Sequence, residues 1–136
     1  MVIHPLPVPD LSHSQVCLPY QSVNFTNAST VADATVAEWH WDFGDPGSGA
    51  ANTSALQNPS HTFGTTVPYT VTLIATSAPG CVNTVSHAVS DIYAQPHANF
   101  TVNPENCLND VTSFTSNATG SGNAITEYHW DFGDAS

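Results

Sequence analysis

Acidic and histidine side chains alternate within an eight-residue word that the chain contains twice. The word reads Glu-Trp-His-Trp-Asp-Phe-Gly-Asp at 38–45 and Glu-Tyr-His-Trp-Asp-Phe-Gly-Asp at 127–134. On a β-strand, alternate residues face the same side about 7 Å apart, so neighbouring carboxylate and imidazole groups could hold a divalent metal ion. The candidate ligands are Glu38, His40 and Asp42 in the first copy and Glu127, His129 and Asp131 in the second. The alternative is that they face solvent beside serine and threonine on neighbouring strands.

Calcium is a second candidate at the end of the same word. Asp42 or Asp45 could bind Ca²⁺ together with backbone carbonyls of the glycine-rich loop at 44–49, because Ca²⁺ prefers oxygen ligands. Bound calcium would also offset some charge repulsion in a chain without lysine or arginine. Calcium is therefore the cofactor that the sequence favours, ahead of another divalent ion at the alternating residues.

Nucleophilic catalysis would need a serine within reach of a histidine and a carboxylate. Ser60, His61 and Asp45 are the residues to consider, but adjacent residues on a strand point to opposite faces, so Ser60 and His61 would not meet. The chain also contains neither Gly-x-Ser-x-Gly nor His-Glu-x-x-His. We therefore expect a protein that is not an enzyme.

The charge balance limits the partners. The 136 residues include 11 acidic side chains, 7 histidines and no lysine or arginine, which gives a net charge of −11. Without cations the chain cannot neutralise the phosphates of nucleic acid or the headgroups of an anionic membrane. It also has no apolar run of about 18 residues, so membrane insertion is not expected. Other protein domains, copies of the chain, neutral glycans and divalent cations remain as partners.

Alternation of apolar and polar residues predicts the β-strands that position these side chains. The stretches 23–27, 38–43 and 69–76 show this period of two and are rich in β-branched and aromatic residues. Loop residues separate them, at 44–49, 58–59, 78–80 and 120–123. No stretch has an apolar stripe at helical spacing, so the sequence predicts an all-β fold.

Large aromatic side chains occupy the other face of the repeated word. Rings of this size would dominate the core of a unit of about 90 residues. The expected core residues are Trp39, Trp41, Phe43, Tyr69, Tyr128, Trp130 and Phe132.

Similarity beyond the word sets the expected domain boundaries. Residues 23–29 correspond to 112–118 at the offset of 89 that also relates Glu38 to Glu127. We expect a proline-rich linker at 1–7, a complete unit at 8–95 and an incomplete second unit at 96–136. The second unit lacks a counterpart of 58–89, so either the chain is a piece of a longer tandem array or another chain supplies the missing strands.

Three ordered motifs resemble those of the polycystic kidney disease (PKD) domain family. They are Trp-Asp-Phe-Gly-Asp at 41–45, Asn-Pro-Ser-His-Thr-Phe at 58–63 and Pro-Tyr-Thr-Val-Thr-Leu at 68–73. The resemblance covers the first unit and all that is present of the second, although Pro46 and Val67-Pro68 depart from the glycines of the family. It implies a non-catalytic immunoglobulin-like β-sandwich, of the kind found as tandem spacers in extracellular surface proteins, adhesins and secreted hydrolases. It also implies a structural role for His61 in the second motif, with its ring bonded to nearby backbone.

The resemblance extends to a cysteine-bearing bacterial subtype of the family, with one cysteine near the first strand and a Gly-Cys after the third motif. Cys17 and Cys81 occupy those places, so the resemblance implies a disulfide between them and leaves the partner of Cys107 beyond Ser136. A disulfide requires an oxidising compartment, which agrees with an extracellular protein. The alternative is three buried thiols in a cytosolic protein.

Five asparagines fit the Asn-x-Ser/Thr pattern of N-glycosylation. They are Asn24, Asn27, Asn52, Asn99 and Asn117, of which Asn52 is the best candidate because we expect it in a loop.

Together these observations predict a spacer and adhesion segment of an extracellular, cell-surface protein built from tandem PKD-like units. One alternative is a subunit of an extracellular filament, in which the second unit accepts strands from a neighbour. Another is a carbohydrate-binding accessory module of a secreted hydrolase. Tyr20 and Tyr93 are the only obvious exposed aromatics for gripping a sugar, which argues against an extensive sugar platform.

Overall fold

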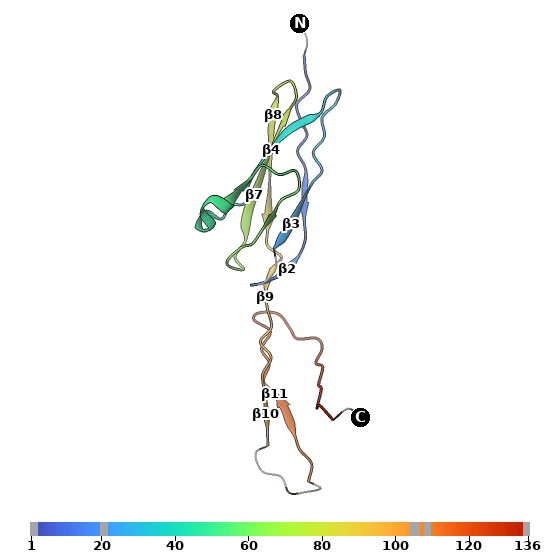
Figure 1. Cartoon of the computed structure of the whole chain (residues 1–136), viewed down its shortest axis with the longest axis vertical. Helices are drawn as coiled ribbons and strands as arrows, with labels where there is room; N and C mark the ends of the chain where they lie inside the picture. The colour runs from blue at the N-terminus through green and yellow to red at the C-terminus, as the bar shows by residue number, and fades with distance from the viewer. Residues whose placement is uncertain (1–2, 20–21, 104–106, 108–109, 135–136) are drawn as a thin grey trace. The chain divides into compact units, whose positions relative to one another are not determined.

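The computed structural model of the chain describes residues 3–19, 22–103, 107 and 110–134. The chain folds as two compact units, Met1–Tyr93 (unit 1) and Ala94–Ser136 (unit 2) (Figure 1). The described part of the chain has no helix with the length and apolar character needed to cross a membrane.

Unit 1 is built almost entirely from short β-strands, as the alternation of apolar and polar residues predicts. The elements in chain order are β1 (Leu11–His13), β2 (Val16–Leu18), β3 (Val23–Asn27), β4 (Val36–Asp42), the 3₁₀ helix η1 (Pro46–Asn52), β5 (Thr53–Ser54), β6 (Ser60–His61), β7 (Tyr69–Ser77), β8 (Val82–Val89) and β9 (Ile92–Ala94).

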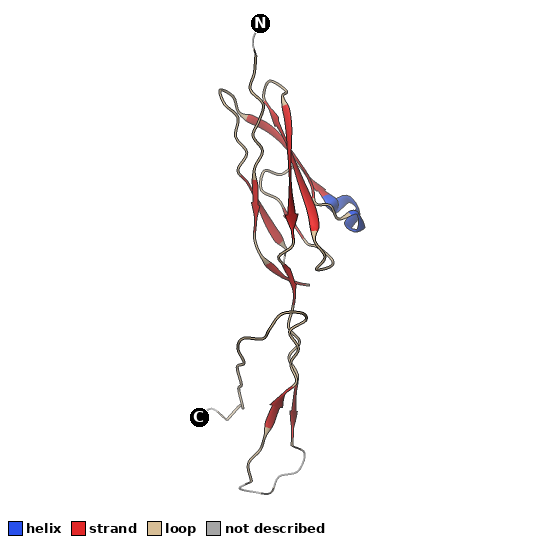
Figure 2. Cartoon of the chain, turned by 180° about the vertical axis from the view of Figure 1, so that it is seen from behind, coloured by secondary structure: helices blue, strands red, loops and turns tan. Residues whose placement is uncertain are grey.

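The strands of unit 1 form an immunoglobulin-like β-sandwich, which confirms the predicted fold class (Figure 2). One sheet has the order β5-β4-β7-β8, a second has the order β1-β3-β6, and β2 pairs with β9. The antiparallel pair of β7 and β8 runs from Tyr69↔Val89 to Thr76↔Val82. This β7–β8 hairpin therefore supplies half of the larger sheet.

The core of unit 1 lies between the sheets and is made by the apolar residues of each alternating strand. Trp41 is 0% and Phe43 is 1% exposed, whereas Trp39 and Tyr69 are half-buried and pack against the core. The buried cluster consists of Leu11, Val16, Leu18, Val23, Phe25, Trp41, Phe43, Phe63, Val71, Leu73, Val89 and Ile92.

Two segments expected to be irregular are ordered by neighbouring residues. Pro46 begins η1 because its fixed φ suits the first turn of a helix. At the N-terminus, Pro7 is buried and its carbonyl accepts a hydrogen bond of 2.9 Å from Nδ2 of Asn83. Val8 then pairs with Thr30. Pro7 and Val8 are therefore held against unit 1 at the end of the expected linker at 1–7.

The described part of the chain contains no disulfide between Cys17 and Cys81. Cys81 directly precedes β8, whereas Cys17 lies in β2, which pairs with β9 beyond the other end of β8 (Figure 1). The 8 residues of β8 span roughly 26 Å at about 3.3 Å per residue. A disulfide needs Cα atoms within about 7 Å, so the structure does not support this pairing.

Unit 2 contains β10 (Phe100–Val102) and β11 (Phe114–Ser116), which pair antiparallel. Their register matches that of β1 and β3 at the offset of 89: Leu11↔Asn27 corresponds to Phe100↔Ser116, and His13↔Phe25 corresponds to Val102↔Phe114. The bridge Val8↔Thr30 likewise corresponds to His97↔Thr119. Unit 2 thus repeats the first strand pair of unit 1.

The aromatic residues of the second word are not buried as expected. Tyr128 is 55%, Trp130 is 36% and Phe132 is 61% exposed. The reason is that the described part of unit 2 has no counterpart of the β7–β8 hairpin, which covers the equivalent rings in unit 1. For these three residues, the predicted core position was wrong.

Candidate functional site

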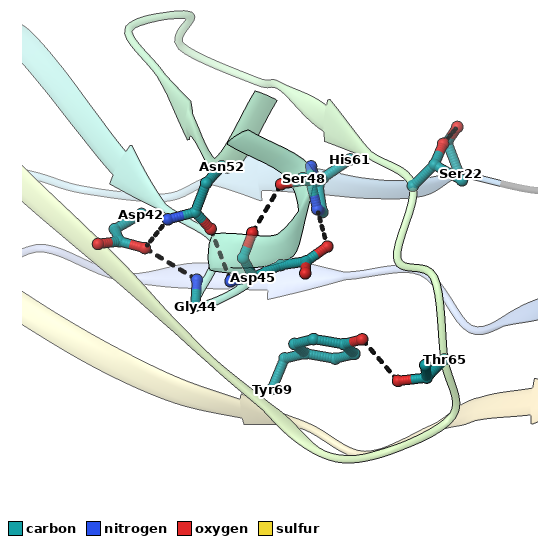
Figure 3. A network of polar contacts seen from close by, with 10 residues as sticks. Ser22, Asp42, Gly44, Asp45, Ser48, Asn52, His61, Thr65 and Tyr69 are labelled. Carbon is teal, nitrogen blue, oxygen red and sulfur yellow. Dashed lines mark hydrogen bonds and ion pairs between the residues drawn. The ribbon is translucent and has the colours of Figure 1, made fainter. Parts of the chain in front are cut away.

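The polar side chains of the first word converge on the loop after β4 (Figure 3). Asp42 is the last residue of β4, and its Oδ1 accepts hydrogen bonds from the backbone N–H of Gly44 and from Nδ2 of Asn52, both at 2.9 Å. A carboxylate that accepts a backbone N–H two residues further on closes an Asx turn. Asp42 therefore ends the strand and fastens the end of η1 to it.

Asp45 fixes the other side of the same loop. Its backbone N–H donates to Oδ1 of Asn52 at 2.6 Å, and its carbonyl accepts from the hydroxyl of Ser48 at 2.7 Å. Its Oδ2 lies 3.1 Å from Nε2 of His61, which comes from β6 in the other sheet. The amide of Asn52 thus bridges both aspartates, and Asp45 links the loop to the second sheet.

His61 is a buried aromatic residue of the core with one polar partner. Its side chain is 3% exposed, and its ring stacks on Phe43 at a centroid distance of 4.4 Å and meets the edge of Phe63 at 4.6 Å. The partner is the Asp45 carboxylate, whereas we expected backbone. Because the Asp45 side chain is itself only 14% exposed, this pair is shielded from solvent and satisfies two polar groups that would be costly to bury alone.

Gly44 is required by both backbone geometry and space. Its φ is +68°, in the left-handed region that glycine adopts readily, and a Cβ placed there would lie 2.4 Å from the carbonyl oxygen of Thr70 in β7. The Asp-Phe-Gly-Asp segment is therefore shaped to let β7 approach it closely.

Ser60 does not share a face of β6 with His61. Ser60 is exposed and His61 is buried, as adjacent residues of a strand must be. His61 and Asp45 do form the pair of a potential triad, but the serine lies on the other face. The alternation of β6 therefore keeps the Ser60 hydroxyl away from the His61–Asp45 pair.

The residues considered for metal binding are arranged as parts of a sheet and a turn. Within the described ranges, no group of three or more His, Cys, Asp or Glu side chains is placed to hold a metal ion. Glu38, His40 and Asp42 lie opposite the uncharged residues Thr76, Ile74 and Thr72 of β7. The turn already uses one carboxylate oxygen each of Asp42 and Asp45, and calcium at these residues stays a prediction.

The candidate glycosylation sites differ in how their amides are used. Nδ2 of Asn52, at the end of η1, donates to Asp42 within the turn network. Oδ1 of Asn27 accepts from the backbone of Ser29, and Nδ2 of Asn117 donates to Thr101. Asn24 and Asn99 are exposed. Glycosylation stays a prediction at each of them.

Few aromatic side chains on unit 1 could grip a sugar. Tyr93 is 38% exposed, and Tyr20 lies outside the described residues. The exposed rings of the second word, which we expected to be buried, are the larger aromatic surface.

Sequence reasoning missed the bond between Asp45 and His61 and the bridging role of Asn52. The signal for the first was present, because Asp45 ends the first motif, His61 lies within the second, and both were considered together as members of a potential triad. Asn52 offered no comparable signal, since its role depends on how η1 turns.

Comparisons with known proteins agree with this geometry. Residues 4–91 match the family model of the PKD domain. The crystal structure of the PKD1 domain of Vibrio anguillarum Epp is similar, with a TM-score of 0.55 and 26% identity over 64% of this chain and 94% of that one. The crystal structure of the PKD1 domain from the Vibrio cholerae metalloprotease PrtV gives a TM-score of 0.53 and 26% identity, covering 62% of this chain and 94% of that one.

The family match and the site geometry lead to the same conclusion. The PKD domain is typically a non-catalytic module, and in unit 1 the polar residues of the repeated word bond to one another and to backbone. The match covers well over half of the chain, so the protein belongs to the PKD domain family.

Proposed function

We propose that the chain is a non-catalytic spacer and adhesion segment of an extracellular, cell-surface protein assembled from tandem PKD-like units. In this role unit 1 holds neighbouring parts of the protein at a fixed separation and resists pulling. Its partners are other protein domains or further copies of itself.

The observation that carries the proposal is the position of the two ends of unit 1. At one end, His4 lies beside Cys81, whose Sγ is 3.9 Å from the His4 carbonyl, directly before β8. At the other end, the chain leaves unit 1 through β9, which follows β8. A sandwich whose chain enters and leaves at opposite ends adds its whole length to an array.

Two further observations support the proposal. The chain has no lysine or arginine, so it contains no site for trypsin-like proteases that act outside cells. A PKD1 domain similar to this chain comes from a bacterial metalloprotease, in which it accompanies an enzyme. A non-catalytic module beside an active one is the arrangement that a spacer serves.

Pulling a single molecule from its two ends tests the mechanical role. We expect unit 1 to unfold in one step, with a length gain of roughly 250 Å for about 85 residues at ~3.4 Å each, less the folded length. Surface labelling of intact cells should reach the protein. Gradual extension without a force peak, or protection of the protein inside cells, would contradict the proposal.

A further inference from the structure

The peptide bond between Asp45 and Pro46 joins the first word to η1, and it is the only Asp-Pro bond in the chain. Pro46 departs from the glycine of the PKD family, and the second word continues from Asp134 into alanine. Neither the shared fold nor the repeat therefore requires this bond, and the spacer role makes no use of it.

An Asp-Pro bond places a nucleophile and a leaving group on the two sides of one carbonyl carbon. The aspartate carboxylate can attack the carbonyl carbon of its own residue and close a five-membered ring, as carboxylates do in other covalent intermediates. The proline nitrogen belongs to a tertiary amide and leaves as a secondary amine. Because both groups lie next to the same carbon, the reaction needs no bimolecular encounter.

Two donors of Ser48 converge on the carbonyl oxygen of Asp45. The backbone N–H of Ser48 lies 3.0 Å from this oxygen and its hydroxyl lies 2.7 Å from it (Figure 3). The first bond belongs to the turn of η1, whereas the second depends on the serine side chain. Attack on the carbonyl carbon puts negative charge on the same oxygen, and two donors at about 2.7–3.1 Å are the geometry of an oxyanion hole.

The Asp45 carboxylate is held in place by His61. Nε2 of His61 lies 3.1 Å from Oδ2, and the Asp45 side chain is only 14% exposed. The other oxygen, Oδ1, lies toward the backbone that follows Pro46, since a Cβ built on Gly47 would be 3.5 Å from it. The titratable side chains that the network joins to Asp45 are His61 directly and Asp42 through Asn52.

We propose that unit 1 cleaves its own backbone between Asp45 and Pro46. Oδ1 of Asp45 bonds to the carbonyl carbon, the C–N bond breaks, and its electron pair stays on the Pro46 nitrogen, which takes a proton from the solvent. A water molecule then opens the cyclic anhydride, leaving Asp45 as a carboxyl terminus and Pro46 as an amino terminus. Acid promotes the cleavage because the nitrogen needs a proton to leave. The reaction occurs once in each chain, so it involves no turnover.

The cut divides the sequence of unit 1 but not its sandwich. The first fragment keeps β1–β4 and the second keeps β5–β9. Because β4 pairs with β5 and β7, β3 with β6, and β2 with β9, each sheet of unit 1 contains strands of both fragments. The fragments should therefore stay together until they are denatured or pulled. The cleavage does not rest on the spacer role; within that role, it turns a covalent link into one that separates under load.

Incubation of the full chain at mildly acidic pH tests the proposal. We expect mass spectrometry after denaturation to show fragments 1–45 and 46–136, which elute together from gel filtration under native conditions. In urea at the same pH, cleavage should be slower by roughly tenfold or more, because the unfolded chain loses the contacts of Ser48 and His61. No fragments from the folded chain, or equal rates in the folded and unfolded chain, would overturn the proposal.

Substitutions at the bond separate self-cleavage from a contaminating protease, with circular dichroism as the check on folding. Asp45→Asn keeps an acceptor for His61 but removes the nucleophile, and Pro46→Gly removes the leaving group, so each should abolish the cut. Ser48→Ala should slow it by roughly tenfold or more, whereas Ser60→Ala, at an exposed position of β6, should leave the rate unchanged. Cleavage of Asp45→Asn at the wild-type rate would overturn the proposal.

Two further measurements test the route and the positioning role of His61. Hydroxylamine added to the folded chain should capture the anhydride as a hydroxamate at Asp45, and its absence from the first fragment would reject the anhydride. His61→Phe keeps an aromatic ring in the core but loses the donor to Oδ2, so it should slow cleavage. His61→Gln regains an N–H donor and should recover part of the rate, which lost packing alone would not allow. Equal rates in both variants would reject the role of His61.

Discussion

Units 1 and 2 contain the same three rings in nearly the same arrangement but with opposite exposure. Phe25, Trp41 and Phe43 are at most 1% exposed, whereas their counterparts Phe114, Trp130 and Phe132 are 36% to 61% exposed. The ring distances within each set differ by only a few tenths of an ångström. Mutual packing of the rings is thus independent of burial, and burial depends on the β7–β8 hairpin.

The secondary structure of the repeated word also differs between the two units. Residues 36–42 form β4 between β5 and β7, while the equivalent residues of unit 2 are irregular. The two segments have nearly the same sequence, so propensity alone does not make the strand. A β-strand needs a partner for its backbone N–H and C=O groups. The first strand pair is present in both units because both of its strands lie within the residues they share.

The largest expected difference in stability comes from removing the tryptophan ring of each word, Trp41 in unit 1 and Trp130 in unit 2. Trp41→Ala should cost about 3–5 kcal/mol, because it empties a fully buried site and orphans the Leu56 carbonyl that accepts from Nε1 at 2.9 Å. Trp130→Ala should cost less than about 1 kcal/mol, because that ring already contacts solvent. Urea unfolding followed by circular dichroism measures both. Equal losses would show that Trp130 is buried in solution.

Replacing Gly44 and Gly133 by alanine tests whether each unit has room for a Cβ at this position of the turn. Gly44→Ala should destabilise unit 1 by about 2–4 kcal/mol, because it combines a positive φ with a contact of 2.4 Å to the Thr70 carbonyl oxygen. Gly133→Ala meets only the cost of the positive φ, about 1 kcal/mol. Hydrogen exchange resolved by residue assigns each loss to its unit. A similar penalty at both positions would place something against Gly133.

The aspartates at the end of each word differ in their long-range partner. Asp45→Ala should cost about 1–3 kcal/mol, because it leaves Nε2 of the buried His61 without its carboxylate. Asp134→Ala should be close to neutral, because Asp134 is exposed and has no counterpart of His61 among the described residues of unit 2. His61→Phe on the Asp45→Ala background is the control, and it should restore part of the loss by removing the orphaned nitrogen.

The sequence predicts the local part of this picture and misses the part that depends on distant residues. Alternation correctly locates β3 and β7, and the three motifs give the sandwich and the family. The position of Cys17 at the opposite end of β8 from Cys81 depends on strand order, which spacing does not encode. The exposure of Trp130 depends on a hairpin that lies outside its own segment. Likewise, Asn52 bridges Asp42 and Asp45 only after η1 has turned.

The smallest expected difference between the units concerns the turn that both retain. Oδ1 of Asp42 accepts from the backbone N–H of Gly44 at 2.9 Å, and Oδ1 of Asp131 accepts from that of Gly133 at 2.8 Å. This Asx turn closes within three residues, so it needs neither the hairpin nor burial. Asp42→Ala and Asp131→Ala should therefore shift the amide proton of the following glycine to a similar extent in NMR spectra. If only the amide proton of Gly44 shifted, the Asx turn would form only in the presence of the β7–β8 hairpin. The local sequence would then be insufficient to form this turn in unit 2.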